Sequence, residues 1–287
     1  MLFSASNELK FSPRFTMQLA QDLFEAGFIT YHRTDSIRVS SAGINVAREY
    51  IEQNFGKEYF APRSFKTKEG AHECIRPTKP MDVDDLKEYL QLNNKKDITQ
   101  NHLRLYDLIF KEFIASQMRE CEVEKVEAEA VFEDKKTDFT FIRKIIKDGF
   151  NKILPIKTYN IDEGHVKIAE KEKFAKPKVP RFSFATLVQQ MKERGIGRPS
   201  TYAIIIQRLF ERRYVYQKNG LIFATNLGKK VYETLKNIPQ IYEFVNEKYT
   251  KELEELMDKV ENKEADYQKV LNDLYMKIKK EIHENLV

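Results

Sequence analysis

The spacing of apolar residues changes its period along this chain, and that change constrains the fold more than any other feature of the sequence. Between residues 13 and 118 apolar side chains recur at helical spacing, which predicts helices over 13–28, 40–54, 84–92 and 99–118. Near residue 119 the pattern becomes an alternation of apolar and charged residues, typical of antiparallel strands, that continues to about residue 170. The sequence therefore predicts a mixed, mainly helical fold with one small antiparallel β segment.

The β segment is expected to contain a hairpin and to end in a linker. Val126, Ala128 and Ala130 alternate with charged residues, and the polar run 134–138 is expected to form the turn between two strands. Residues 173–180 contain prolines among lysines and predict a connection without regular structure.

Beyond this linker the chain returns to helical spacing. A helix is expected over the apolar stripe 184–191, a break at 195–197, and a second helix with Pro199 at its first position. Asn-Gly at 219–220 between two apolar runs predicts a β-hairpin. Helix, turn, helix and hairpin together predict a winged-helix module, and the tail 240–287 predicts two charged amphipathic helices.

Composition narrows the function classes only slightly. The formal net charge of the 287 residues is +5 at pH 7, which suits an anionic partner without proving one. The two cysteines form no C-x-x-C pair, so neither a zinc finger nor a disulfide framework is indicated. No apolar run approaches the roughly 18 residues needed to span a bilayer, and the N-terminus lacks a signal-peptide pattern. We therefore expect a cytoplasmic protein with no membrane partner.

Tyr31 and Arg33 form the first candidate site. In an extended segment residues i and i+2 point to the same face, so both side chains would address one site. A phenol is a weak nucleophile at neutral pH, but a neighbouring guanidinium favours the phenolate and binds phosphate in a fork. The pair suggests nucleophilic attack on a phosphodiester. A packed ring beside a solvated charge is the ordinary alternative.

His72, Glu73 and Arg76 form the second candidate. A histidine and an arginine four residues apart can share a helical face and bind phosphate oxygens, with Glu73 orienting one of them. The alternative is an ordinary surface loop.

The third candidate is the segment 195–201. Its glycines let the backbone approach a ligand closely, and a helix starting at Pro199 would point free amides at an anion. Arg198 adds charge, while Ser200 and Thr201 add hydroxyl donors. The spacing of a nucleotide-binding P-loop is absent, and a helix-capping turn is the alternative.

Taken together and in this order, the segments 31–36, 71–77 and 195–202 resemble three motifs of the type IA DNA topoisomerases. Gln21, ten residues before the tyrosine, fits the same family. The resemblance covers nearly the whole chain. The residues at 74–78 lean toward the topoisomerase half of reverse gyrases.

The resemblance implies a role for each candidate residue. Tyr31 would attack a backbone phosphorus of single-stranded DNA and retain the 5′-phosphate as a phosphotyrosyl ester, until the released 3′-hydroxyl attacks back. Arg33 would stabilise the charge that develops on the phosphorus. The neighbouring phosphates and sugars would be held by Gln21, His72, Arg76, Arg198, Ser200 and Thr201.

The family architecture also implies a division of the chain. Residues 1–118 resemble the mobile domain that carries the active-site tyrosine, and 119–178 resemble part of the β-rich arch. Residues 179–287 resemble the helical, winged-helix-like domain that binds single-stranded DNA.

Finally, the resemblance implies a magnesium ion held by a Toprim domain that this sequence does not contain. The acidic run 82–85 precedes a helical pattern and is expected to cap a helix, so we assign no metal ligand in this chain. We expect the chain alone to be inactive and to need a Toprim-containing N-terminal half or subunit. ATP would be required only if that partner carries a helicase.

Other interpretations remain open. The chain is expected to be either a fragment of the enzyme or one subunit of a split enzyme that works at the nucleoid. A non-catalytic single-stranded-DNA-binding module and a structural partner of a larger complex are the alternatives. The presence of Tyr31, Arg33 and His72 together favours the enzyme.

Overall fold

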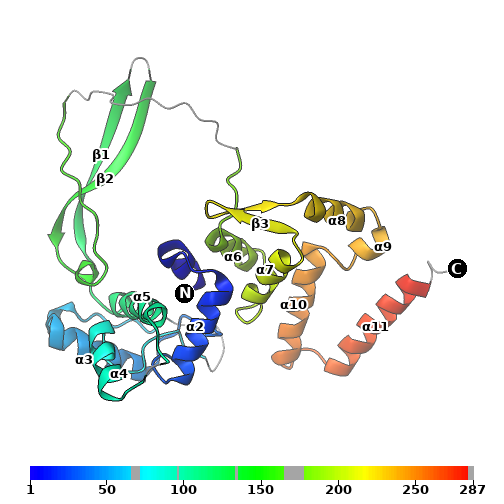
Figure 1. Cartoon of the computed structure of the whole chain (residues 1–287), viewed down its shortest axis with the longest axis horizontal. Helices are drawn as coiled ribbons and strands as arrows, with labels where there is room; N and C mark the ends of the chain where they lie inside the picture. Colours follow the sequence, from blue (N-terminus) through cyan, green and yellow to red (C-terminus); the bar gives the residue numbers. More distant parts are fainter. Residues whose placement is uncertain (66–71, 96, 133–134, 165–177, 284–287) are drawn as a thin grey trace. The chain divides into compact units, whose positions relative to one another are not determined.

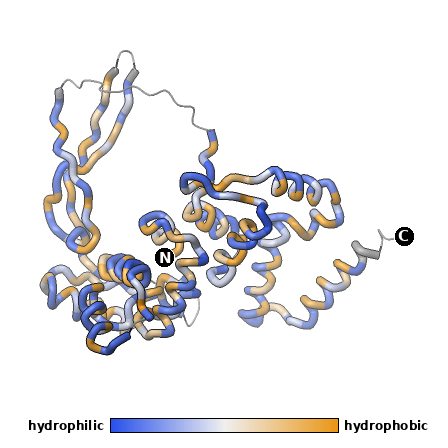
Figure 2. Tube along the Cα trace, viewed as in Figure 1, coloured by the Kyte–Doolittle hydropathy of each residue, from blue (hydrophilic) through white to orange (hydrophobic). Residues whose placement is uncertain are grey.

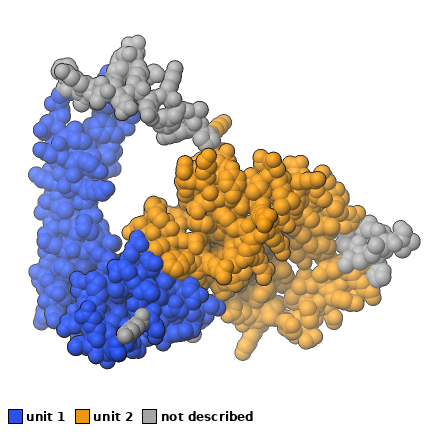
Figure 3. All heavy atoms as spheres, viewed as in Figure 1, with its two compact units in different colours: residues 1, 18–176 blue, residues 2–17, 177–287 orange. Residues whose placement is uncertain are grey.

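The computed structural model describes residues 1–65, 72–95, 97–132, 135–164 and 178–283. Contacts within the chain divide it into two compact units, drawn in different colours in Figure 3. Unit 1 comprises Met1 and residues 18–176, and unit 2 comprises residues 2–17 and 177–287. The expected three-part division stays a prediction, and residues 173–177 of the expected linker lie outside the described residues.

Helices predicted from the apolar spacing build unit 1 (Figure 1). They are the later part of α2 (Pro13–Glu25), α3 (Ser41–Asn54), α4 (Val83–Leu92) and α5 (Gln100–Ser116). At the start of α4, the Asp82 carboxylate accepts hydrogen bonds from the amides of Asp84 and Asp85 at 2.9 and 3.0 Å. These amides would otherwise lack a partner at a helix start, so the acidic run caps a helix as predicted.

The core of unit 1 surrounds α5. Leu105, Tyr106 and Phe110 are almost fully buried, because α5 carries apolar residues around much of its circumference. The Phe110 ring meets the Tyr50 ring edge-on at 4.8 Å, and the Tyr106 hydroxyl donates to the Met81 carbonyl oxygen at 2.6 Å. These contacts make α5 the centre of the core of unit 1.

Unit 1 also carries an antiparallel ribbon of two strands, β1 (Glu122–Phe132) and β2 (Lys135–Lys147). Ala128 pairs with Phe139 in its register. Residues 135–138 were expected in the turn, but they belong to β2, since the pairing extends as far as Phe132 and Lys135. Asp134 lies outside the described residues.

The expectation of strands up to about residue 170 is wrong for the described residues 148–164, which contain no strand. The ribbon ends because the chain doubles back at Gly149. A Cβ atom at Gly149 would lie 2.2 Å from the Glu120 carbonyl oxygen, so only glycine permits this approach. The Phe150 amide then donates to the Arg119 carbonyl oxygen at 3.0 Å.

Unit 2 contains the short helical segments α1 (Leu2–Ser4) and Ala5–Leu9, then α6 (Phe184–Glu193) and α7 (Tyr202–Glu211). Its core is a cluster of Val188, Met191, Tyr202 and Ile206, which α6 and α7 contribute. The stripe predicted over 184–191 is therefore the buried face of α6.

The predicted hairpin follows as β3 (Val215–Lys218) and β4 (Leu221–Ala224). Asn219 and Gly220 both have positive φ, 51° and 78°, as the commonest two-residue hairpin turn requires. The order of helix, turn, helix and hairpin is confirmed, while a winged-helix arrangement stays a prediction.

The remaining helices of unit 2 are α8 (Asn226–Lys236), α9 (Pro239–Tyr242), α10 (Glu247–Glu261) and α11 (Tyr267–His283). The last two are the charged helices predicted for the tail, and apolar residues are interleaved with polar ones along both (Figure 2). Helices α8 and α9 are not among the elements predicted from the sequence. A mixed, mainly helical fold with small antiparallel sheets is thus confirmed. None of the helices in the described ranges is long and apolar enough to cross a bilayer.

Candidate active site

The tyrosine segment and the second motif are brought together by a short antiparallel pairing in unit 1. Ile29 forms a β-bridge with Pro77, and the Thr30 amide donates to the Arg76 carbonyl oxygen at 2.9 Å. The Arg76 amide donates in turn to the Thr30 hydroxyl at 3.0 Å, across 46 residues of sequence. Two motifs that are distant in the sequence therefore form one structural element.

This pairing places Tyr31 against His72. The two rings stack with centroids 5.7 Å apart and an interplanar angle of 27°. Phe24 on α2 meets the other side of Tyr31 edge-on at 5.5 Å. Tyr31 still keeps 40% of its surface exposed.

Arg33 is held from α2. Its Nη2 donates to the Gln21 Oε1 at 3.2 Å, and the Gln21 amide donates to the Glu25 carboxylate at 2.6 Å. The structure forms no hydrogen bond between Arg33 and the Tyr31 hydroxyl. Gln21, selected from the sequence for its distance from the tyrosine, thus contacts the arginine of the pair.

Arg76 has a different setting from the one expected. Residues 72–76 lie outside any helix, so the predicted helical face shared by His72 and Arg76 is wrong. The Arg76 side chain is only 6% exposed, and its Nε and Nη2 both donate to the Glu73 carboxylate at 2.9 Å. Its Nη1 donates to the Pro77 carbonyl oxygen at 2.8 Å. A phosphate could reach this guanidinium only by displacing Glu73.

Glu73 is the counterpart that fixes Arg76. Burial favours the neutral acid, but hydrogen bonds from Arg76 and from the Ser40 hydroxyl hold the pKa of Glu73 below its ordinary value. Ser40 also caps α3 by accepting from the Gly43 amide at 3.2 Å. A Cβ atom on Gly43 would lie 2.7 Å from the Arg76 Nε, so α3 packs directly on the ion pair.

His32 is a residue of this site that sequence reasoning missed. Its ring is 2% exposed, contacts the rings of Phe24 and Tyr31, and has no hydrogen-bond partner at either nitrogen. Burial and the positive charge of Arg33 lower the pKa of His32 to about 4, against a smaller opposite effect of Glu25. The imidazole is therefore neutral near pH 7. Its position between Tyr31 and Arg33 in the sequence was the only available signal.

The third motif belongs to unit 2, and the helix after it begins later than expected. α7 starts at Tyr202, not at Pro199. The reason is a turn in which the Arg198 carbonyl oxygen accepts from the amides of Thr201 and Tyr202 at 2.8 and 3.1 Å. The Thr201 hydroxyl accepts from the Arg198 amide at 2.8 Å, and Ser200 is exposed.

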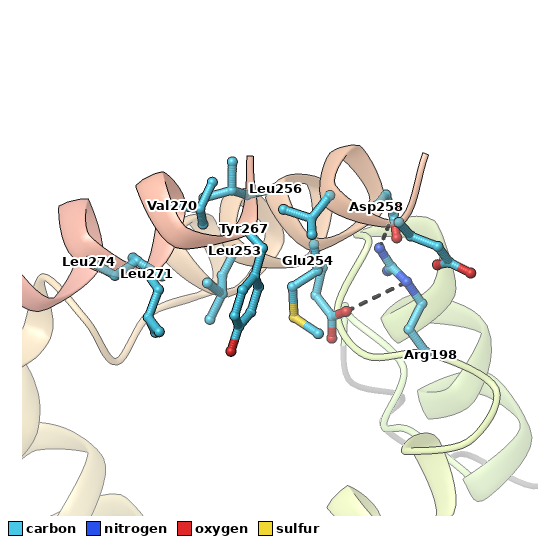
Figure 4. A pocket seen from close by; sticks show the side chains of 12 residues that line it. Arg198, Leu253, Glu254, Leu256, Asp258, Tyr267, Val270, Leu271 and Leu274 are labelled. Carbon is cyan, nitrogen blue, oxygen red and sulfur yellow. Dashed lines mark hydrogen bonds and ion pairs between the residues drawn. The ribbon is translucent and has the colours of Figure 1, made fainter. Parts of the chain in front are cut away.

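The Arg198 guanidinium already has anionic partners on α10 (Figure 4). Its Nη2 donates to the Asp258 carboxylate at 2.6 Å, and its Nε lies 3.5 Å from a Glu254 oxygen. Partial burial opposes the charge, but the hydrogen bond that Arg198 donates to Asp258 and the two negative charges raise the pKa of Arg198 above its ordinary value. Glu254 and Asp258 were also missed, although they share one helical face by their spacing.

The chain is similar to known proteins of one family. Residues 1–272 match the family model described as DNA topoisomerase. The chain is 46% identical over 279 residues to reverse gyrase 1 of Aquifex aeolicus, with 97% of this chain and 24% of the relative covered. It is 44% identical over 287 residues to reverse gyrase of Pyrococcus furiosus, with 97% and 23% covered.

Among solved structures, full-length topoisomerase I from Thermotoga maritima matches with a TM-score of 0.78 and 32% identity. The match covers 97% of this chain and 48% of that one. The chain thus spans about a quarter of the length of the curated relatives named above.

Proposed function

The chain belongs to the type IA DNA topoisomerases, and we propose that it carries the strand-cleaving nucleophile of such an enzyme, Tyr31. The pairing of residues 28–30 with 76–78 is the observation that carries this proposal, because it sets an exposed phenol against His72. A nucleophile for DNA has to be both reachable and held in place. Tyr31 combines 40% exposure with ring contacts on several sides.

In the proposed reaction the Tyr31 oxygen loses its proton and attacks a backbone phosphorus. A bond forms between this oxygen and the phosphorus, and the bond from the phosphorus to the 3′-oxygen breaks. The 3′-oxygen takes up a proton and later attacks the phosphotyrosyl ester to reseal the strand. One phosphodiester is exchanged for another, so neither step needs an external energy source.

The neighbouring side chains divide the remaining work. Arg33 stabilises the negative charge that develops on the phosphate oxygens, and Gln21 orients Arg33 through the hydrogen bond at 3.2 Å. His72 packs on the nucleophile and contacts the DNA backbone. Arg76 holds the His72 segment through Glu73 and acts as a positioning residue.

Unit 2 supplies the second part of the proposed function. We assign to its helix, turn, helix and hairpin a winged-helix-like role in binding single-stranded DNA. Arg198, Ser200 and Thr201 address the phosphate backbone, whose contacts position a strand without reading its sequence.

Magnesium is proposed to act from another part of the complete enzyme. The residues in the described ranges hold no group of three or more His, Cys, Asp or Glu side chains that could bind a metal ion. A Toprim-containing part would supply the ion, and ATP would be used only if the complete enzyme also contains a helicase part. The assembled enzyme would act on DNA in the nucleoid.

The decisive experiment replaces Tyr31 by phenylalanine. The chain is combined with a Toprim-containing part of a reverse gyrase, magnesium and labelled single-stranded DNA, and the covalent adduct is measured on a denaturing gel. Tyr31→Phe removes one oxygen and keeps the ring, so we expect unchanged DNA binding and complete loss of the adduct. Tyr159→Phe is the matched control, since Tyr159 is a comparably exposed tyrosine of unit 1.

An adduct that persists in Tyr31→Phe would overturn the assignment. DNA binding without an adduct in the unsubstituted chain, under conditions where an intact relative forms one, would favour the non-catalytic binding module instead.

A further inference from the structure

The segment 195–201 is called the glycine-arginine turn below, and the stretch of α10 that faces it carries its contact residues at helical spacing. Glu247, Lys251, Glu254 and Asp258 follow one another at intervals of four, three and four residues, which places them on one face of the helix. Three of the four are acidic. These carboxylates meet two cations, Arg194 at the end of α6 and Arg198 in the turn that follows.

The turn and α10 are in close contact along this face. A Cβ atom at Gly195, which has a φ of 68°, would lie 3.3 Å from the Cγ of Lys251. Arg194 pairs with Glu247 at 2.8 Å at the more exposed end, where the two side chains are 52% and 65% exposed. At the other end Arg198 and Glu254 are only 32% and 19% exposed. The Arg198 end is therefore the better shielded of the two.

Two separate carboxylates share the Arg198 guanidinium. The Asp258 carboxylate accepts a hydrogen bond from Nη2 at 2.6 Å, and a Glu254 oxygen lies 3.5 Å from Nε (Figure 4). Nη1 donates to the Gly197 carbonyl oxygen at 3.1 Å. A guanidinium binds the oxygens of a phosphate with the same nitrogens and the same fork geometry. A DNA phosphate at Arg198 would have to take the place of Asp258 or Glu254.

We propose that Glu254 and Asp258 act as a built-in competitor for the DNA phosphate at Arg198, so that α10 limits the affinity of unit 2 for a single strand. The proposal rests on the proposed role of Arg198 in DNA binding. It assigns to α10 a function that the three motifs do not contain: it sets the strength with which the turn holds a phosphodiester. Strand binding then releases the Arg198 end of α10 from the turn.

The test compares Asp258→Asn with Glu247→Gln in the full chain. Both variants remove one negative charge from the same face of α10, but only Asp258→Asn removes a charged partner of Arg198. Affinity for a labelled oligothymidylate is measured by fluorescence anisotropy at fixed salt. We expect Asp258→Asn to bind about threefold more tightly than Glu247→Gln, the scale of a partly exposed ion pair. Glu254→Gln should change affinity in the same direction by a smaller factor, because its distance to Arg198 is longer.

Equal affinities of Asp258→Asn and Glu247→Gln would overturn the proposal, and so would weaker binding by Asp258→Asn, which would make the carboxylate a support that orients Arg198 for DNA. Circular dichroism confirms that each variant retains its helices, and Glu254→Gln provides the second reading if Asp258→Asn does not fold.

A double variant separates this proposal from the one on which it rests. In an Arg198→Ala background the added Asp258→Asn substitution should no longer raise affinity relative to Glu247→Gln, because the competed cation is gone. If Arg198→Ala itself leaves binding unchanged, the role of Arg198 in DNA binding fails. If Arg198→Ala weakens binding while Asp258→Asn equals its control, only the competitor fails.

Discussion

Arg76 in unit 1 and Arg198 in unit 2 each lie in a motif selected for phosphate binding, and each is paired with carboxylates. The Arg76 side chain is 6% exposed and fully engaged by Glu73 and Pro77. The Arg198 side chain is 32% exposed, and one of its partners, Asp258, is 51% exposed. The same residue type thus forms a buried ion pair in one unit and a partly exposed one in the other.

The two sites differ in the burial of the arginine itself, which is 6% exposed at Arg76 and 32% exposed at Arg198. Displacing Glu73 from Arg76 would leave a charge unpaired in the interior, which is strongly unfavourable. Displacing Asp258 from Arg198 returns a carboxylate to water, which costs little. We therefore expect the proposed competition by a DNA phosphate at Arg198 and not at Arg76.

The largest effect that follows is on stability. Arg76→Ala removes the partner of Glu73 and is expected to lower the free energy of unfolding by about 3 kcal/mol. Chemical denaturation measures this change. The double variant Arg76→Met with Glu73→Leu should recover much of the loss, since it leaves neither charge unpaired. A single variant as stable as the unsubstituted chain would show that the ion pair is no scaffold.

A second effect concerns pH and His32. Because the pKa of His32 falls from 6.5 to about 4 on folding, the unfolded chain takes up a proton in this range that the folded chain does not. The contribution to stability is complete above pH 6.5 and is lost as the pH falls toward 4. Glu73 affects stability in a lower pH range. Because its pKa is lowered on folding, its contribution to the free energy of unfolding is complete above the ordinary value of 4.5 and is lost only as the pH falls below it.

His32→Leu should therefore flatten the pH dependence of unfolding. Between about pH 7 and about pH 5 we expect the loss of stability to shrink by about 2 kcal/mol relative to the unsubstituted chain. Denaturation curves at the two pH values measure it. An equal decline in both proteins would mean that the buried imidazole is protonated without cost, and that unit 1 opens around Tyr31.

A third effect concerns catalysis at the tyrosine. Gln21→Ala releases Arg33 from α2, and we expect adduct formation to slow by about tenfold through loss of orientation, with little change in DNA affinity. Gln18→Ala is the matched control on the same helix, because Gln18 bonds Asp22 and not Arg33. Equal rates in the two variants would remove Gln21 from the site.

The sequence predicted the helices and strands of both units better than it predicted the burial and the partners of their charged side chains. Helical spacing located α3, α4 and α5 to within a few residues, and Asn219-Gly220 located the hairpin, because these signals are local. The pairing of Thr30 with Arg76 joins residues 46 apart, and no local pattern contains it. For the same reason the sequence could not tell that Arg76 is buried by α3 or that Asp258 meets Arg198 across 60 residues.

The smallest effect is the one that separates the two arginines most clearly. Arg198→Ala should lower the free energy of unfolding by less than about 1 kcal/mol, because its partners lie partly in water. Its affinity for single-stranded DNA should fall, and the slope of log K against log salt should decrease by about one if the side chain neutralises one phosphate. Arg194→Ala is the control, since it loses the same charge next to the turn but outside the motif.

An anisotropy titration over a salt series measures the slope. A stability loss as large as that of Arg76→Ala, with an unchanged slope, would make both arginines scaffold residues and leave the glycine-arginine turn as a helix cap.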